Sequence, residues 1–85
     1  PEMDVEGARD TAERLRQRVG NAPIPLESGH SVPLTISVGV AVYPVHGHTV
    51  ETLCSAADKA MYQAKMQGRN CVAMAQPIEP VHNET

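Results

Sequence analysis

Residues 34–43 read Leu-Thr-Ile-Ser-Val-Gly-Val-Ala-Val-Tyr (LTISVGVAVY), and this stretch decides the fold. Its side chains alternate between two faces, which is the period of a β-strand. One face is branched and apolar: Leu34, Ile36, Val38, Val40 and Val42. The other face is mostly small: Thr35, Ser37, Gly39, Ala41 and Tyr43. Because both faces can be covered, we predict a central strand over 34–43.

The small face of this strand allows a helix or a ligand to approach the sheet closely. Gly39 lies in mid-strand, where a glycine weakens a strand unless a close approach requires it. We interpret the small face as a packing surface.

A first amphipathic helix is predicted over 5–19, before the strand. Asp4 is a good N-cap for it and Gly20 is a natural C-cap. Apolar residues recur at helical spacing along one side: Ala8, Ala12, Leu15 and Val19. Three arginines lie late in the helix and are interpreted as a solvated face: Arg14, Arg16 and Arg18.

A second helix follows the strand after a turn at 44–48. Thr49 is expected to cap its start, and Gly68 is expected to end it. Its apolar residues repeat at intervals of three and four: Val50, Leu53, Ala57, Ala60, Met61 and Ala64. The alanines in this stripe predict close packing of the helix against a sheet.

The remaining segments complete the pattern. Residues 20–33 contain several prolines and glycines and form a connector, with room for some pairing at Ile24–Leu26. Cys71–Met74 is a short apolar strand, and 76–85 is a polar tail or linker. The order helix, strand, helix, strand predicts a layered α+β (α/β) fold with helices covering a mixed sheet. Two convincing strands leave that sheet incomplete.

Length, charge and cysteine usage limit the classes of function. A chain of 85 residues allows one small domain, and its start at Pro1 favours a piece of a longer protein. The net charge of −3 does not favour general binding to nucleic acid, which is itself negatively charged. No apolar run is long enough to span a bilayer. Cys54 and Cys71 are expected to be free, buried thiols in a reducing compartment, with Cys54 in a packing role.

The most informative polar residues lie in the stretch AKMQGRN at 64–70. Lys65 and Arg69 would flank the junction between the second helix and the last strand. Two cations there can complement the helix dipole, or they can form one pole of an anion site for a polyphosphate. Spacing alone favours the dipole role and leaves the anion site open.

Other candidate sites carry weaker signals. His46 and His48 form an H-x-H in a turn, which we interpret as an ordinary polar turn because no further metal ligands lie nearby. Cys71 follows the basic cluster, where a lowered thiol pKa is conceivable, but no paired histidine supports a nucleophile. The chain carries no Gly-rich phosphate loop and no known catalytic signature. We therefore predict no catalytic residue and no metal ligand in this segment.

Several of these stretches together resemble one family, the GGDEF domain of bacterial diguanylate cyclases. The matching pieces are LTISVGVA at 34–41, Tyr43-Pro44, AADKAMYQAK at 56–65 and Gly68-Arg69-Asn70. Residues 1–19 are similar to the helix that follows the family's signature hairpin. The resemblance covers residues 1–75 and implies the C-terminal part of a nucleotidyl-cyclase-like fold, with 76–85 as tail or linker.

The family's signature sequence and its metal-binding aspartate are not in these residues. The resemblance places both upstream of Pro1, along with the guanine-recognising residues and the product-inhibition motif. The Mg²⁺ ligands are therefore expected upstream as well, and the chain alone is expected to be inactive.

The resemblance implies specific roles for Lys65 and Arg69, whose equivalents in the family contact the phosphates of GTP. The parent protein would condense two GTP molecules into cyclic di-GMP and pyrophosphate as a homodimer, in bacterial signal transduction. The alternative is a degenerate domain that binds GTP or cyclic di-GMP as a regulatory module. An upstream sensory domain and a cytoplasmic location are also implied, with membrane anchoring of the parent left open. A fragment with an open sheet edge is expected to dimerise or exchange strands.

Overall fold

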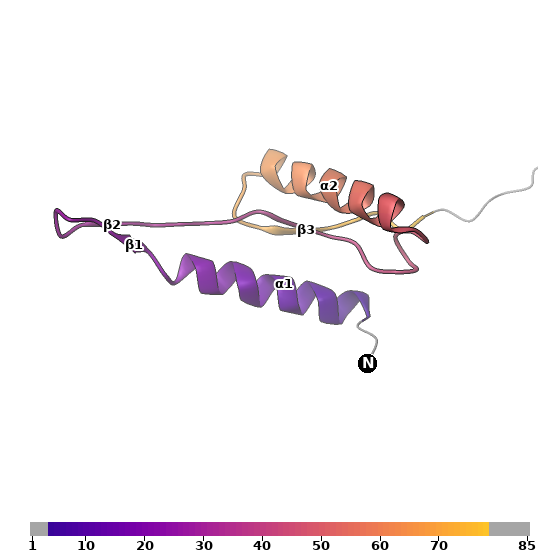
Figure 1. The fold of residues 1–85 in the computed structure, drawn as a ribbon, viewed down its shortest axis with the longest axis horizontal. Helices are drawn as coiled ribbons and strands as arrows, with labels where there is room; N and C mark the ends of the chain where they lie inside the picture. The colour runs from indigo at the N-terminus through magenta and orange to yellow at the C-terminus, as the bar shows by residue number, and fades with distance from the viewer. Residues whose placement is uncertain (1–3, 79–85) are drawn as a thin grey trace, which may run out of the picture.

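A computed structural model describes residues 4–78 of the chain. Its elements follow in the order α1 (Val5–Gly20), β1 (Ile24–Pro25), β2 (Ser31–Val32), β3 (Val38–Val40), α2 (Val50–Met66) and β4 (Val72–Met74). The β1–β2 hairpin reaches away from the rest of the molecule (Figure 1). The predicted order of helices and strands is confirmed. The connector also pairs within the predicted segment, with Ile24 opposite Val32.

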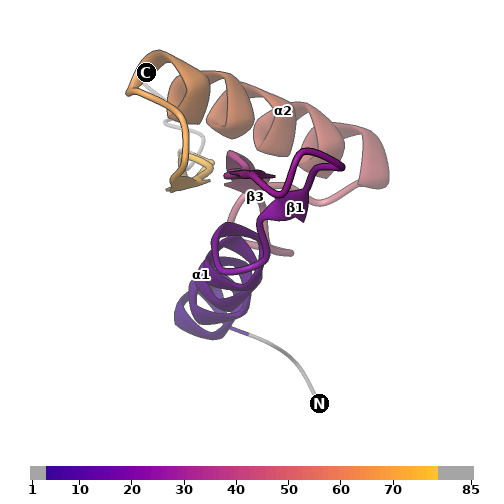
Figure 2. The ribbon, with the colours of Figure 1, turned by 90° about the vertical axis from the view of Figure 1, so that its left-hand side faces the viewer.

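The β3 and β4 strands form a parallel pair at the centre of the molecule. Their register places Val38 opposite Val72 and Val40 opposite Met74. Because parallel neighbours need a long crossover connection, α2 links the two strands as a β-α-β unit. The two helices lie on opposite sides of the strand pair (Figure 2), and each contacts both strands. The result is a three-layered α+β arrangement.

The strand predicted over 34–43 is much shorter than predicted, and it is not central: within residues 4–78, β3 pairs on one side only, with β4. The pattern predicts a strand over 34–43, and the structure forms one only at Val38–Val40. A strand exists only where a neighbour completes its hydrogen bonds, and β4 is itself limited to Val72–Met74. Within residues 4–78, the segment 34–37 has no ladder partner. Cys71, predicted to start the last strand, lies just before it.

The small face of β3 packs directly against the backbone of α2. A Cβ added at Gly39 would overlap the Ala57 carbonyl oxygen and the Met61 backbone, and would come within 2.9 Å of the Met61 Cα. Ala60 and Ala64, farther along α2, are 2% and 0% exposed. A helix therefore makes the close approach that Gly39 permits. The predicted packing surface is confirmed at Gly39, whereas Thr35 and Tyr43, at the two ends of that face, are exposed.

The predicted stripe on α2 is buried only in part. Thr49 caps the helix as predicted, since its hydroxyl accepts a hydrogen bond from the Thr52 N–H at 3.1 Å. Val50, however, is 76% exposed, and Cys54 is exposed rather than packed. Gly39 of β3 lies against Ala57 and Met61, so the first turns of α2 extend past the short strands. Apolar side chains there have no sheet beneath them.

The predicted ends of α1 are correct at the start and wrong at the finish. The Asp4 carboxylate accepts a hydrogen bond from the Gly7 N–H at 2.7 Å, as an N-cap does. The helix continues through Gly20, and Asn21 caps it with a φ of −93°. Because this cap does not use the left-handed region, it does not require a glycine.

His46 is a buried structural residue rather than an ordinary polar turn residue. It is 3% exposed, and its Nδ1 accepts a hydrogen bond from the Val42 N–H at 2.8 Å. The His46 N–H in turn donates to the Val42 carbonyl at 2.9 Å. This reciprocal pair closes the turn after β3. His48 is exposed, and its ring forms a T-shaped pair with the Tyr43 ring at a centroid distance of 6.2 Å.

Replacing His46 with alanine is expected to lower the free energy of unfolding by about 1–3 kcal/mol, because the Val42 N–H loses its acceptor in a part-buried site. The matched control is His48→Ala, which removes an exposed imidazole from the same turn and should change stability little. Thermal unfolding of the complete protein would measure both. Equal losses in the two variants would contradict the structural role of His46.

The residues that follow β4 pack against the rest of the described structure. The Ile78 N–H donates to the Val45 carbonyl at 3.0 Å, which ties this segment to the turn after β3. The rest of the predicted tail, 79–85, lies outside the described residues. No helix in the described part of the chain has the length and apolar character needed to cross a membrane.

Candidate functional site

The C-terminal end of α2 forms a Schellman motif around Gly68. The Arg69 N–H donates to the Ala64 carbonyl at 3.0 Å, and the Gly68 N–H donates to the Lys65 carbonyl at 3.4 Å. Gly68 has a φ of +117°, which an L side chain rarely adopts. The predicted end of the helix near Gly68 is therefore confirmed, and the helix stops at Met66.

The left-handed backbone continues beyond the glycine. Arg69 has a φ of +66° and Asn70 a φ of +48°. Asparagine tolerates this region, whereas arginine seldom occupies it. These residues turn the chain away from the helix axis and toward β4, so Arg69 does not continue the helical face of Lys65. We refer to Gly68, Arg69 and Asn70 as the GRN turn.

Lys65 and Arg69 flank the junction between α2 and β4, as the sequence predicts. Lys65 lies in the last turn of α2 and Arg69 lies in the GRN turn, and both are exposed. With the residues that the structure describes, neither side chain forms a hydrogen bond or an ion pair. Both cations are thus open to an anionic ligand. Their role in phosphate binding stays a prediction.

Arg16 departs from the predicted solvated face of arginines. Its Nε and Nη2 donate to the two carboxylate oxygens of Glu13, the first at 2.8 Å. Its Nη1 donates to the Asn70 Oδ1 at 2.9 Å. The side chain is only 22% exposed. The reason is tertiary: α1 packs against β4, and this brings Arg16 beside the turn that precedes that strand.

The contact between Arg16 and Glu13 also shifts the pKa values of both side chains. The hydrogen bond from Arg16 lowers the pKa of the Glu13 carboxyl below its usual value. The same bond raises the pKa of the Arg16 guanidinium. Both groups are therefore charged near neutral pH. The spacing of Glu13 and Arg16 on one helix could have indicated this pair, but no local signal points to Asn70.

The two cysteines differ in their surroundings. Cys71 is part-buried and its Sγ donates to the Ala64 carbonyl at 3.4 Å, so its thiol belongs to the end of α2. Cys54 is exposed on the same helix.

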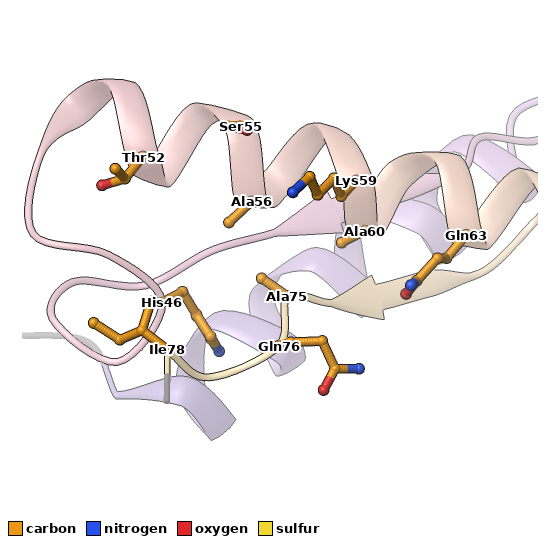
Figure 3. Close-up of a pocket in the computed structure, with 10 residues that line it drawn as sticks. All are labelled: His46, Thr52, Ser55, Ala56, Lys59, Ala60, Gln63, Ala75, Gln76 and Ile78. Carbon is orange, nitrogen blue, oxygen red and sulfur yellow. The ribbon is translucent and has the colours of Figure 1, made fainter. Parts of the chain in front are cut away.

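A cavity of about 340 Å³ lies beside α2. The α2 residues that line it are Thr52, Ser55, Ala56, Lys59, Ala60 and Gln63 (Figure 3). His46, from the turn after β3, and Ala75, Gln76 and Ile78, which follow β4, complete the lining. Since neither Lys65 nor Arg69 is among these residues, the cavity is not the candidate phosphate site.

Metal ligands do not gather in the described part of the chain. Residues 4–78 contain no group of three or more histidine, cysteine, aspartate or glutamate side chains that could hold a metal ion. One histidine of the H-x-H pair, His46, uses its Nδ1 to accept a backbone hydrogen bond.

Comparison with known proteins identifies the family. The family model described as "Diguanylate cyclase, GGDEF domain" matches residues 1–71. The chain therefore belongs to the GGDEF domain family.

Individual relatives agree with this assignment. The chain is 38% identical over 79 residues to the uncharacterized protein YhcK of Bacillus subtilis, covering 93% of this chain and 22% of that protein. It is 38% identical over 73 residues to the response regulator PleD of Caulobacter vibrioides, covering 85% of this chain and 16% of PleD. It is 40% identical over 65 residues to the diguanylate cyclase DosC of Escherichia coli, covering 75% of this chain and 14% of DosC.

A solved structure shows the same fold. The crystal structure of the GGDEF domain of PA1120 (YfiN or TpbB) from Pseudomonas aeruginosa superimposes with a TM-score of 0.78 at 34% sequence identity. The match covers 92% of this chain and 48% of that one. The chain thus spans about half of the solved domain and a smaller share of the three relatives above.

Proposed function

We propose that this chain is the phosphate-binding half of a diguanylate cyclase domain. In the complete domain, two GTP molecules would be joined into cyclic di-GMP with release of two pyrophosphates. The observation that carries the proposal is the junction of α2 and β4, where Lys65 and Arg69 are exposed and unpaired among residues 4–78. Membership of the GGDEF family supports the choice of GTP as the ligand.

The two cations would bind and orient the triphosphate. Arg69 offers a planar fork of donors that suits two phosphate oxygens, and Lys65 offers a compact point charge. In the reaction, the 3′-hydroxyl of one nucleotide attacks the α-phosphate of the other, and the bond to the pyrophosphate breaks. The cations stabilise the negative charge on the phosphates as that bond breaks. One domain would hold one nucleotide, so turnover would need a homodimer.

The family resemblance implies that the Mg²⁺ ligands of the complete domain lie outside residues 4–78. The contribution that we propose for this chain is to bind and orient the phosphates, and the isolated chain is expected to be inactive.

A second candidate function is a module that binds GTP or cyclic di-GMP without turnover. The same observation supports it, since Lys65 and Arg69 can hold phosphates whether or not chemistry follows. An intact acidic signature elsewhere in the GGDEF domain would favour the enzyme, and a degenerate one would favour the module.

A product assay on a protein that contains the whole GGDEF domain separates the two functions. The protein would be incubated with GTP and magnesium, and the nucleotides separated by chromatography. Cyclic di-GMP together with pyrophosphate would establish the cyclase. Retained GTP or cyclic di-GMP without product would support the binding module. Neither product nor binding would contradict both.

A further inference from the structure

We infer that Arg16 and Glu13 of α1 form a positioning pair that holds the GRN turn, and through it holds Arg69 in place for the substrate phosphates. This inference rests on the proposed role of Arg69. It assigns a function to residues that are distant in sequence from the candidate site.

The geometry of Arg16 is that of a fixed connector. Two of its guanidinium nitrogens bind the Glu13 carboxylate, and this fork-to-fork contact restricts the guanidinium plane. Glu13 is held in turn by the Gln17 Nε2, which donates to it at 3.1 Å. The third nitrogen of Arg16 donates to the Asn70 Oδ1 at 2.9 Å. The Asn70 Oδ1 therefore accepts from a guanidinium whose orientation is already fixed by Glu13.

The GRN turn is held by backbone hydrogen bonds at its two ends, and its side chains have little further support. Residues 65–70 are all exposed, and Arg69 and Asn70 both occupy the left-handed region. The Schellman hydrogen bonds fix the N–H groups of Gly68 and Arg69. Within residues 4–78, the contact between Asn70 and Arg16 is the only side-chain hydrogen bond that ties the turn to another element. The backbone of Arg69 is thus held by its own N–H on one side, and its neighbour Asn70 is held by Arg16 on the other.

The charge around Arg16 favours positioning over direct phosphate binding. The charged residues that line the recess beside Arg16 balance one another: two are cations, Arg9 and Arg16, and two are carboxylates, Asp10 and Glu13. Glu13 neutralises Arg16 in a salt bridge. An anionic ligand would therefore gain little from Arg16, in contrast to the unpaired Arg69. The effect of Arg16 on a phosphate ligand must pass through the turn.

A double-mutant cycle in the protein that contains the whole GGDEF domain tests this inference. Arg16→Ala is expected to lower kcat/KM for GTP about fivefold, because a displaced binding group loses part of its effect. In the Arg69→Ala background, Arg16→Ala should add no further loss, because no guanidinium remains to be positioned. The affinity for GTP, measured in the same four proteins, should show the same coupling even if the domain only binds.

Two further variants separate the hydrogen bond from the backbone. Asn70→Asp keeps an acceptor oxygen and tolerates the left-handed region, but it adds a negative charge beside Arg69, so it should retain more activity than Asn70→Gly and less than the unaltered protein. Asn70→Gly keeps the backbone conformation but removes the acceptor, so it should match Arg16→Ala. The control is Arg18→Ala, which removes an exposed arginine of the same helix and should leave kcat/KM unchanged.

The outcomes are distinct. Equal losses from Arg16→Ala in both backgrounds would show a general structural role and would overturn the positioning pair. Full activity and affinity in Arg16→Ala, with Arg69→Ala impaired, would overturn the pair and leave the phosphate assignment intact. Full activity and affinity in Arg69→Ala would overturn both the pair and the proposed role of Arg69.

Discussion

Replacing Arg69 with alanine in the complete domain is expected to lower kcat/KM for GTP about 10- to 100-fold. A hydrogen bond to a charged group contributes about 1.5–3 kcal/mol, and its loss converts to a factor of that size. Arg69 is exposed and its side chain forms no hydrogen bond or ion pair within the described residues, so its removal should leave the fold intact. Lys65→Ala should weaken turnover in the same direction. Steady-state kinetics of purified variants would measure both.

The controls for this prediction come from the same helix and the same position. Lys59→Ala removes an exposed lysine from α2 away from the junction and should leave turnover unchanged. Arg69→Lys keeps the charge but loses the planar fork, so it should recover part of the loss. The phosphate assignment fails if kcat/KM is unchanged in both Lys65→Ala and Arg69→Ala.

Replacing Gly39 with alanine is expected to destabilise the protein more than the loss of His46 does. The new Cβ would overlap backbone atoms of Ala57 and Met61, which cannot rotate aside as a side chain can. The helix would have to move away from β3, at a cost of about 3 kcal/mol or more, at the upper end of typical overpacking. Thermal or denaturant unfolding of the complete protein would measure the loss.

Gly20→Ala is the matched control for this substitution. Gly20 lies at the end of α1, and no atom lies within 4 Å of an added Cβ. Because alanine has a better helix propensity than glycine, this variant should be neutral or more stable by up to about 1 kcal/mol. Similar losses from Gly39→Ala and Gly20→Ala would show that glycine content, and not the contact with α2, explains the result.

Sequence patterns predicted the parts of this fold that depend on near neighbours. The alternation in 34–43 correctly assigned Gly39 to a packing face, and Thr49 and Gly68 correctly marked the ends of α2. These features rest on backbone geometry and on spacing within one element. For the same reason, the local run at 64–70 was sufficient to place Lys65 and Arg69 at one junction.

Features that depend on distant partners could not be predicted in this way. The length of β3 is set by β4, and both faces of LTISVGVAVY look equally suited to a longer strand. Val50 follows the stripe of α2 but lies beyond the short strands, so it is exposed. The contact of Arg16 with Asn70 joins residues 54 positions apart. Helical periodicity shows which residues share a face of one helix, and it cannot predict a contact between that helix and a distant turn.

Gly39 and Gly68 are both required by the fold, but they set different limits on how the sequence can diverge. At Gly39 the limit is space, because every other residue has a Cβ atom and there is no room for a Cβ between β3 and α2. At Gly68 no atom lies within 4 Å of an added Cβ, and the limit is chirality, since an achiral residue enters the mirror-image region without strain. Any L residue at Gly68 would be strained by this φ of +117°, although its Cβ would displace no neighbouring atom. A substitution at Gly68 would therefore distort the turn that carries Arg69 and leave α2 packed on β3, whereas a substitution at Gly39 would push α2 away from β3.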